Sequence, residues 1–121
     1  MAQYQHLPIY KTTYELLQLV TRATSGFPKA YKYSLGDKLR TEVVEMVVFI
    51  FKANSSRADR AAHAAALLER LQVVQLLMRL SRDLRILSVK QFSEIVGMTD
   101  SLGRQASGWI KASATLLAES K

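Results

Sequence analysis

The chain has 121 residues, a formal net charge of +7, five glycines, two prolines and no cysteine, and 49% of its residues are hydrophobic. This length accommodates one hydrophobic core, so we expect a single domain over residues 1–121. The absence of cysteine excludes disulfides, thiol nucleophiles and thiolate metal ligands. His6 and His63 are the only imidazoles, too few for an ordinary metalloenzyme, so we expect no metal and no cofactor.

The charge and hydropathy patterns limit where the protein acts. Residues 1–10 lack the basic start and apolar run of a secretory signal. The longest strongly apolar run, residues 46–51, is far shorter than the roughly 20 residues that a membrane-spanning helix needs. We therefore expect a cytoplasmic protein with no membrane partner. Its basic excess suits an acidic partner, either nucleic acid or a negatively charged protein surface.

Hydrophobic residues recur at helical spacing along the first half of the chain. Pro8 suits the first turn of a helix and Gly26 ends it, so the first helix is predicted over residues 8–25. Ser34 is a candidate cap for a second helix, predicted over residues 35–53.

The second predicted helix contains a run of β-branched and aromatic residues, 43–51. On propensity alone this run is typical of a strand, but helical spacing continues across it and favours a helix. The run is apolar on more than one face, which indicates contacts beyond its own bundle. We therefore expect Val44, Val48 and Phe49 at an interface between subunits.

Capping patterns mark the starts of two further helices. In each, a serine precedes by three residues an Asp or Gln that can complete a capping box. The two pairs are Ser56 with Asp59 and Ser88 with Gln91, and the predicted helices cover residues 56–86 and 89–117. Four helices with short joints predict an all-α fold, an antiparallel up-and-down four-helix bundle.

The fourth predicted helix contains three glycines, each costing up to about 1 kcal/mol against alanine, so they need a packing reason. They are Gly97, Gly103 and Gly108. Gly108 precedes Trp109, the only tryptophan, whose large area suits the core or an interface. Small residues there would let another backbone approach, from the bundle or from a second subunit. Gly108 and Trp109 are therefore candidate interface residues.

The positive charge is concentrated in the third predicted helix and the joints beside it. Arg79, Arg82 and Arg85 follow one another at intervals of three, so we expect them on neighbouring parts of one helical surface, with Lys90 just beyond. One interpretation is a solvated face near a helix C-terminus, with Asp83 offering compensation. The other is contact with phosphates, which gives salt-dependent affinity without reading sequence.

A second basic cluster is interleaved with Tyr31 and Tyr33. Its members are Lys29, Lys32, Lys38 and Arg40. Proteins that bind single-stranded nucleic acid typically combine aromatic rings, on which bases stack, with cations that follow the phosphate backbone of the strand. Tyrosines beside lysines are also common in helix joints, so both interpretations remain open.

Carboxylates give no convincing catalytic site. Glu42 and Glu45 stand three residues apart, which permits a metal or acid–base role, but the Glu-x-x-His pairs of di-iron bundles are absent. No glycine-rich phosphate loop and no nucleophile motif occurs. We therefore expect no enzymatic activity.

Three segments carry a resemblance to known proteins. Residues 79–92, RLSRDLRILSVKQF, and residues 102–111, LGRQASGWIK, resemble the accessory variability determinant (Avd) family of diversity-generating retroelements. Residues 31–39, YKYSLGDKL, resemble the wider four-helix-bundle family that includes proteins encoded in intervening sequences of 23S ribosomal RNA genes.

The resemblance implies an antiparallel four-helix bundle that assembles into a homopentamer. It also implies a non-enzymatic role, in which the protein binds nucleic acid (RNA or DNA) and the reverse transcriptase of the element. By this resemblance, the residues expected to contact nucleic acid or the polymerase are Arg79, Arg82, Arg85, Lys90 and Arg104. The alternative is a protein–protein assembly module of the same fold, with no retroelement role, whose basic face meets an acidic protein.

Overall fold

The computed structural model describes residues 4–119, with side chains through residue 113. Four long helices make up most of it: α1 (Pro8–Ser25), α3 (Leu35–Ser55), α4 (Arg60–Asp83) and α5 (Val89–Glu119). A single turn of 3-10 helix, η1 (Tyr4–His6), precedes α1, and a one-turn helix, α2 (Lys29–Lys32), joins α1 to α3. The described residues contain no strand, and the β-branched run in residues 43–51 lies inside α3. The all-helical fold is therefore confirmed.

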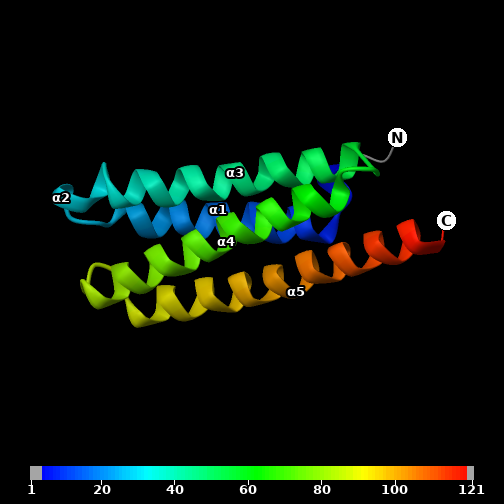
Figure 1. Cartoon of the computed structure of the whole chain (residues 1–121). Coiled ribbons are helices and arrows are strands. Elements are labelled where there is room, and N and C mark those ends of the chain that lie inside the picture. The colour runs from blue at the N-terminus through cyan, green and yellow to red at the C-terminus, as the bar shows by residue number, and fades with distance from the viewer. Residues whose placement is uncertain (1–3, 120–121) are drawn as a thin grey trace.

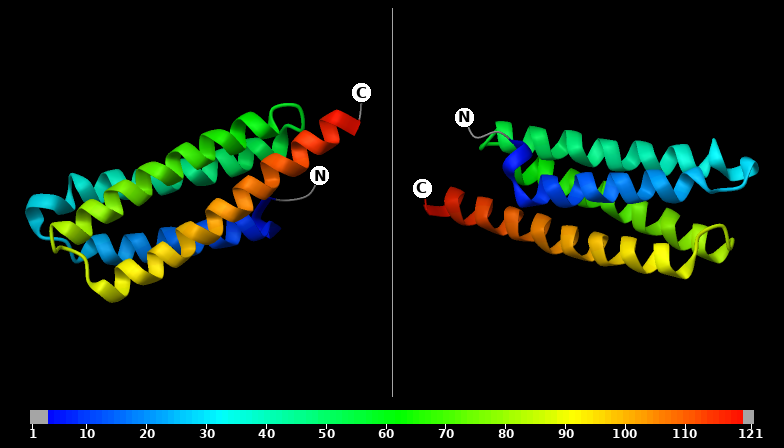
Figure 2. Two further views of the ribbon diagram at one scale, coloured as in Figure 1. Left: turned by 60° about the horizontal axis from the view of Figure 1, so that its bottom comes forward. Right: turned by 180° about the vertical axis from the view of Figure 1, so that it is seen from behind.

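The long helices run alternately up and down the molecule, and each packs against two others (Figure 1). Helix α1 packs against α3 and α5, and α4 packs against the same two helices, which closes a four-helix bundle. Both termini lie at the end that carries the α3–α4 joint (Figure 2). Helix α2 and the α4–α5 joint lie together at the opposite end (Figures 1 and 2).

All four long helices contribute to one apolar core. Each presents residues spaced three or four apart, so one stripe of each helix is removed from water. The largest side chains that are fully buried include Leu16, Leu39, Met46, Ile50, Leu67, Met78, Ile95 and Leu102. Burial of one such side chain contributes roughly 1.5–3 kcal/mol, so this core is the main source of stability. No helix in the described chain combines the length and apolarity needed to cross a bilayer.

Gly36 lies where α3 is in close contact with α1. A Cβ atom placed there would lie 3.3 Å from the Cβ of Thr24 on α1 and 3.4 Å from a guanidinium nitrogen of Arg40. Residue 36 is therefore a glycine because the two helices leave little room for a side chain.

Two predicted helix starts differ from the observed ones in detail. Ser34 stands at the start of α3, but its hydroxyl donates backward to the carbonyls of Ala30 and Tyr31, so the prediction of a side-chain cap is wrong. The Ser56 hydroxyl does accept a hydrogen bond from the Asp59 backbone N–H at 3.2 Å. That contact shapes a turn, and α4 begins only at Arg60.

The start of α5 follows the predicted capping box. The Gln91 backbone N–H donates to the Ser88 hydroxyl at 3.1 Å, and the Ser88 backbone N–H donates to the Gln91 side-chain oxygen at 3.3 Å. Two orphan N–H groups are thereby satisfied, and the helix begins at Val89 as predicted.

The end of α4 changes the predicted position of Arg85. The helix ends at Asp83, and Arg85 adopts a left-handed backbone with a φ of 60°. Its N–H donates to the Arg82 carbonyl at 2.9 Å, while the Ile86 N–H donates to the Ser81 carbonyl at 3.1 Å. This is a Schellman turn, which usually has glycine at the position of Arg85. The prediction that Arg85 shares one helical surface with Arg79 and Arg82 is therefore wrong.

Candidate functional site

Both predicted basic clusters lie at the same end of the bundle, the end that carries α2 and the α4–α5 joint (Figures 1 and 2). Residues 22–40 and 79–94, which we call the basic end, contain nine Lys and Arg and three Asp and Glu. The rest of the chain contains eight basic and seven acidic residues. The net charge of the protein therefore belongs almost wholly to one end.

Three cations at the α4–α5 joint are open to solvent. Arg79, Arg85 and Lys90 are exposed, and their side chains form no ion pair, hydrogen bond or ring contact with any described residue. Arg82 differs, because its guanidinium lies 4.7 Å from the centre of the Phe92 ring and contacts an Asp83 carboxylate oxygen at 3.1 Å. Arg82 is thus fixed in place, while the other three are free to contact a ligand.

Arg22 is a further cation of the basic end that the sequence did not single out. It is exposed in the last turn of α1 and, with Lys90, lines a hollow of about 510 Å³ between α1 and α5. Glu94 lines the same hollow without forming an ion pair to either cation. The residues are 68 positions apart in the chain, so only the fold brings Arg22 to Lys90.

The cations of the predicted cluster at α2 are of two kinds. Some are exposed to solvent, and others, which we call occupied, are paired with acidic side chains of the same chain. Lys29 is exposed and has no side-chain partner among the described residues. The Lys32 ammonium lies 5.8 Å from the centre of the Tyr33 ring, which is 66% exposed. Tyr31 is half-buried against the core, so only Tyr33 presents its ring to solvent.

Lys38 and Arg40 are occupied by contacts within the chain. The Lys38 ammonium lies 2.9 Å from a Glu42 carboxylate oxygen. The Arg40 guanidinium pairs with Asp37 and donates to the Thr24 hydroxyl at 2.6 Å, which ties α3 to α1. The free cations of the basic end are therefore Arg22, Lys29, Arg79, Arg85 and Lys90.

Glu42 is a buried carboxylate with two cationic partners. It is 2% exposed, and its oxygens lie 2.9 Å from Lys38 and 3.1 Å from Arg70 of α4. Burial raises the pKa of Glu42, but hydrogen bonds and charges from Lys38 and Arg70 outweigh it, so the pKa lies below its ordinary value of 4.5. Glu45 is exposed. Among the described residues, no three His, Asp or Glu side chains lie close enough together to hold a metal ion.

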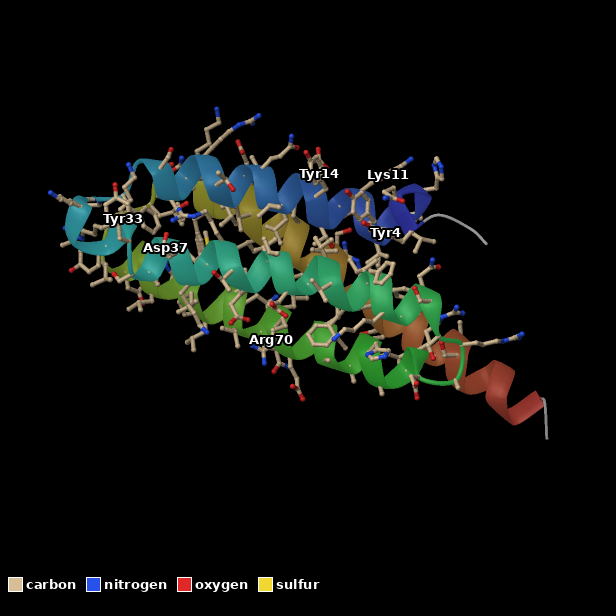
Figure 3. All side chains as sticks on the ribbon, turned by 90° about the horizontal axis from the view of Figure 1, so that it is seen from above. Tyr4, Lys11, Tyr14, Tyr33, Asp37 and Arg70 are labelled. Carbon is tan, nitrogen blue, oxygen red and sulfur yellow. The ribbon has the colours of Figure 1, made fainter. Side chains whose placement is uncertain are left out.

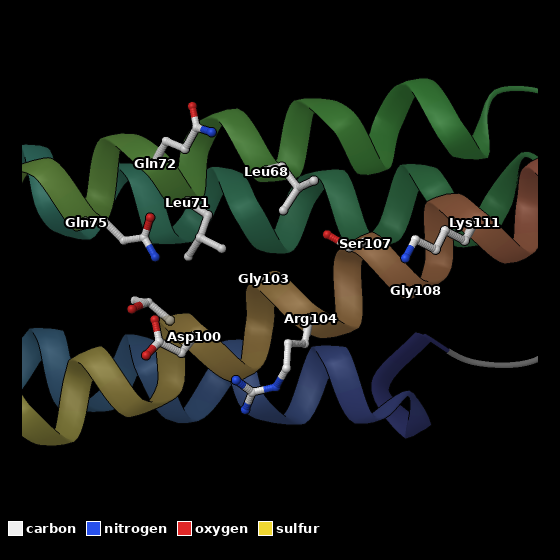
Figure 4. Close-up of a pocket in the computed structure, with 11 residues that line it drawn as sticks. Leu68, Leu71, Gln72, Gln75, Asp100, Gly103, Arg104, Ser107, Gly108 and Lys111 are labelled. Carbon is white, nitrogen blue, oxygen red and sulfur yellow. The ribbon is translucent and has the colours of Figure 1, made fainter.

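Arg104 stands apart from the basic end. It follows Lys90 by 14 residues on α5, a separation of about 21 Å along the helix axis. It lines a groove of about 630 Å³ between α4 and α5, and its side chain turns away from α4 (Figure 4). The structure therefore does not bring Arg104 together with the other predicted contact residues.

The three glycines of α5 differ in what surrounds them. A Cβ at Gly103 would contact a Leu71 methyl at 3.7 Å, which is ordinary packing. A Cβ at Gly97 or Gly108 would meet no described atom within 4 Å. Packing within one chain therefore gives no reason for these two glycines.

Two of the predicted interface residues lie on an exposed apolar surface. Val44 and Val48 are 46% and 36% exposed on α3, beside Phe51 at 50%. Rings from the N-terminal segment extend this surface. The Tyr4 ring centre lies 5.3 Å from that of Phe51 and 5.2 Å from that of Tyr10, and Tyr10 stacks on Tyr14 at 6.0 Å between ring centres. Figure 3 labels Tyr4 and Tyr14 in this group. We call this surface, Tyr4, Tyr10, Tyr14, Val44, Val48 and Phe51, the α1/α3 face.

The other predicted interface aromatics, Phe49 and Trp109, contact side chains of other helices in the same chain. Phe49 is half-buried, with its ring centre 6.4 Å from that of His63 on α4. Trp109 is half-buried under the Arg60 guanidinium, 5.8 Å from the ring centre. Arg60 also donates to the Ala53 carbonyl at 2.9 Å, so it links the end of α3 to α5. Sequence reasoning did not foresee this link.

A comparison with protein families identifies what this bundle is related to. A model of the bAvd-like family matches residues 7–113, which include all four long helices except the last turns of α5. A search of curated proteins finds no match. The match confirms the resemblance to Avd proteins in residues 79–92 and 102–111. The chain therefore belongs to the bAvd-like family.

Proposed function

We propose that this protein is a non-enzymatic scaffold that binds nucleic acid, RNA or DNA, through its basic end. The five free cations carry the proposal, because all five are exposed at one end of the bundle and none has an acidic partner among the described residues. Cations of this kind contact phosphates and release condensed counterions, which gives affinity without sequence readout. Of the three acidic side chains at this end, Asp37 and Asp83 are already paired with Arg40 and Arg82. Glu94 lines the hollow that Arg22 and Lys90 share but forms no ion pair with either, and one carboxylate does not balance five cations.

Salt dependence of binding tests this proposal. The test variant carries Arg79→Ala, Arg85→Ala and Lys90→Ala, and the matched control carries Lys11→Ala, Lys52→Ala and Arg57→Ala at the opposite end. Both lose three charges. We expect the slope of log affinity against log salt for a labelled oligonucleotide to fall by about 2 to 3 in the test variant only. Equal slopes in the two variants would contradict the proposal.

An acidic protein is the alternative partner for the same cations. Purified chain treated with nuclease would then retain an acidic protein in a pull-down, and would bind oligonucleotides weakly at every salt concentration. That outcome would assign the basic end to an assembly module in place of a nucleic-acid scaffold.

We also propose that a reverse transcriptase is a partner, on the strength of the family. Avd-like proteins that the sequence resembles act beside such an enzyme. We therefore expect a reverse-transcriptase gene and a template repeat next to the gene of this chain. Their absence would remove the retroelement role and leave the nucleic-acid scaffold to stand on its own test.

We further propose that the protein forms a homo-oligomer, a pentamer as the resemblance implies. A ring in which every copy contacts two neighbours needs two different faces on each copy. The α1/α3 face is one. The other is a row of exposed leucines along the last turns of α4 and just beyond its end, namely Leu76, Leu80 and Leu84, at 64%, 43% and 39% exposure. Exposed apolar surface of this extent is typical of interfaces. Five copies would carry about +35 in formal charge.

Light scattering after size exclusion tests the ring. Val48→Glu and Leu76→Glu should each dissociate the oligomer, while Val89→Glu, at the basic end, should leave its mass unchanged. A mixture of Val48→Glu and Leu76→Glu should form a dimer, because each variant keeps the face that the other has lost. A monomeric wild-type protein, or no dimer in the mixture, would contradict a ring built on these two faces.

A further inference from the structure

The basic end exposes aromatic and apolar surface among its cations. Tyr33 projects at the end of the bundle, 66% exposed, with the Lys32 ammonium 5.8 Å from its ring centre and Lys29 one turn away (Figure 3). Its neighbour Tyr31 is half-buried against the core, so the exposure of Tyr33 is not a general property of this segment. A ring held in this way contributes nothing to the folded core.

A second apolar feature lies at the start of α5. Arg82, Val89, Phe92, Ser93 and Val96 line a hollow of about 270 Å³ between α4 and α5. Val89 is 79% exposed, the most exposed large apolar side chain of those described. The guanidinium of Arg82 rests on the Phe92 ring at 4.7 Å and is held by Asp83, which fixes a flat cation at the edge of the hollow.

Binding of a duplex does not require the exposed Tyr33 ring or the apolar hollow beside Val89. A duplex stacks its base faces on one another and presents phosphates, for which the free cations suffice. Unpaired bases present flat π faces, which stack on aromatic rings and on guanidinium planes. Exposed rings and apolar side chains among free cations therefore match a single strand in particular.

We propose that the basic end selects single-stranded nucleic acid, with unpaired bases stacking on Tyr33 and entering the hollow beside Val89 and Phe92. The inference rests on the proposed nucleic-acid binding and adds the class of ligand. The free cations follow the phosphates of the strand, while the rings hold its bases. Because stacking tolerates any base, the selection is for strandedness and not for sequence.

Binding of an oligouridine and of a duplex RNA of equal length, measured by fluorescence anisotropy at one salt concentration, tests the inference. We expect the wild type to bind the strand more tightly. Tyr33→Ser should weaken strand binding by roughly 5- to 100-fold and leave duplex binding within about twofold. Tyr33→Phe, which keeps the ring, should bind the strand like the wild type. Because residue 33 is exposed, circular dichroism should show all three proteins folded alike.

A variant at the hollow tests the single-strand inference independently of Tyr33. Val89→Ser removes apolar surface without changing charge, and it should weaken strand binding while sparing the duplex. Equal wild-type affinity for strand and duplex, or equal losses on both ligands in the variants, would overturn the single-strand inference alone. Failure of the wild type to bind either ligand would overturn the proposed function and this inference with it.

Discussion

The two ends of the bundle use their cations differently. At the end with the termini, Arg60 donates to the Ala53 carbonyl and covers Trp109, and the Lys52 ammonium lies 5.1 Å from the Phe49 ring centre. Lys11 and Arg57 are exposed there too, but basic and acidic residues are nearly balanced outside the basic end. At the basic end the basic residues exceed the acidic ones by six, and five cations have no partner in the described part of the chain. The local excess of basic over acidic residues, more than the exposure of single cations, therefore distinguishes the proposed binding surface from the other end.

The same contrast exists within the basic end. Lys38 and Arg40 hold Glu42 and Asp37, and Arg40 also joins α3 to α1, so these cations stabilise the fold. The side chains of Arg79 and Lys90 have no partner among the residues that the structure describes. We therefore expect substitutions of occupied cations to change stability and substitutions of free cations to change binding.

Loss of Arg70 should have the largest effect on stability. Arg70→Met leaves the buried Glu42 carboxylate with Lys38 alone, and should lower the free energy of unfolding by about 2 kcal/mol, discounted for the partial exposure of Arg70. Urea denaturation measures this loss. Adding Glu42→Gln to the variant should restore part of it, because the uncompensated charge is then gone. An unchanged urea midpoint in the single variant would contradict the role of this ion pair.

The pH dependence of stability sharpens the role of Glu42. Its pKa in the folded protein is lowered, so its contribution is fully present above its ordinary value of 4.5 and is lost as pH falls through the folded pKa. The difference in unfolding free energy between wild type and Glu42→Gln should therefore shrink below about pH 4.5. A difference that stays constant with pH in urea denaturation series would argue against this ion pair.

Arg40 and Arg79 provide a matched comparison of occupied and free cations. Arg40→Met should lower the free energy of unfolding by about 1 kcal/mol, because Asp37 and Thr24 lose their partner. It should leave the salt slope of binding unchanged. Arg79→Met should leave stability within about 0.5 kcal/mol and lower the salt slope by roughly 0.7–0.9. The comparison fails if both variants change the same property.

Arg85 should show opposite effects on stability and binding. Its left-handed backbone favours glycine, so Arg85→Gly should raise the free energy of unfolding by about 0.5 kcal/mol. The same substitution removes a free cation and should weaken binding of nucleic acid. Thermal melting and anisotropy measure the two effects. Destabilisation by Arg85→Gly would mean that the arginine side chain has a structural contact that outweighs its backbone strain.

Much of the fold could be predicted because it depends on local patterns. Helical spacing, Pro8 and the capping box of Ser88 with Gln91 depend on residues within a few positions of one another. The end of α4 could not be predicted in this way. Arg85 has a residue type that continues a helix, and only the Schellman turn places it outside.

The candidate site was only partly predictable. The two basic clusters are visible in the sequence, but their location at the same end of the bundle follows from the antiparallel order of the helices. Arg22 was missed because a lone arginine at a helix end carries no local signal. Lys38 and Arg40 have acidic residues at helical spacing, Glu42 and Asp37, which is a local sign of ion pairs. Arg70 and Thr24, which complete those contacts, come from other helices and carry no such signal.

Lysine acetylation footprinting tests the central claim most directly, because it compares the two ends in one unaltered protein. The rate of modification of each lysine is measured by mass spectrometry with and without a bound oligonucleotide. The account predicts that Lys29, Lys32 and Lys90 are protected while Lys11 and Lys52 react as in the free protein. Protection of Lys11 and Lys52, with Lys29 and Lys90 still reactive, would contradict the assignment of nucleic-acid binding to the basic end.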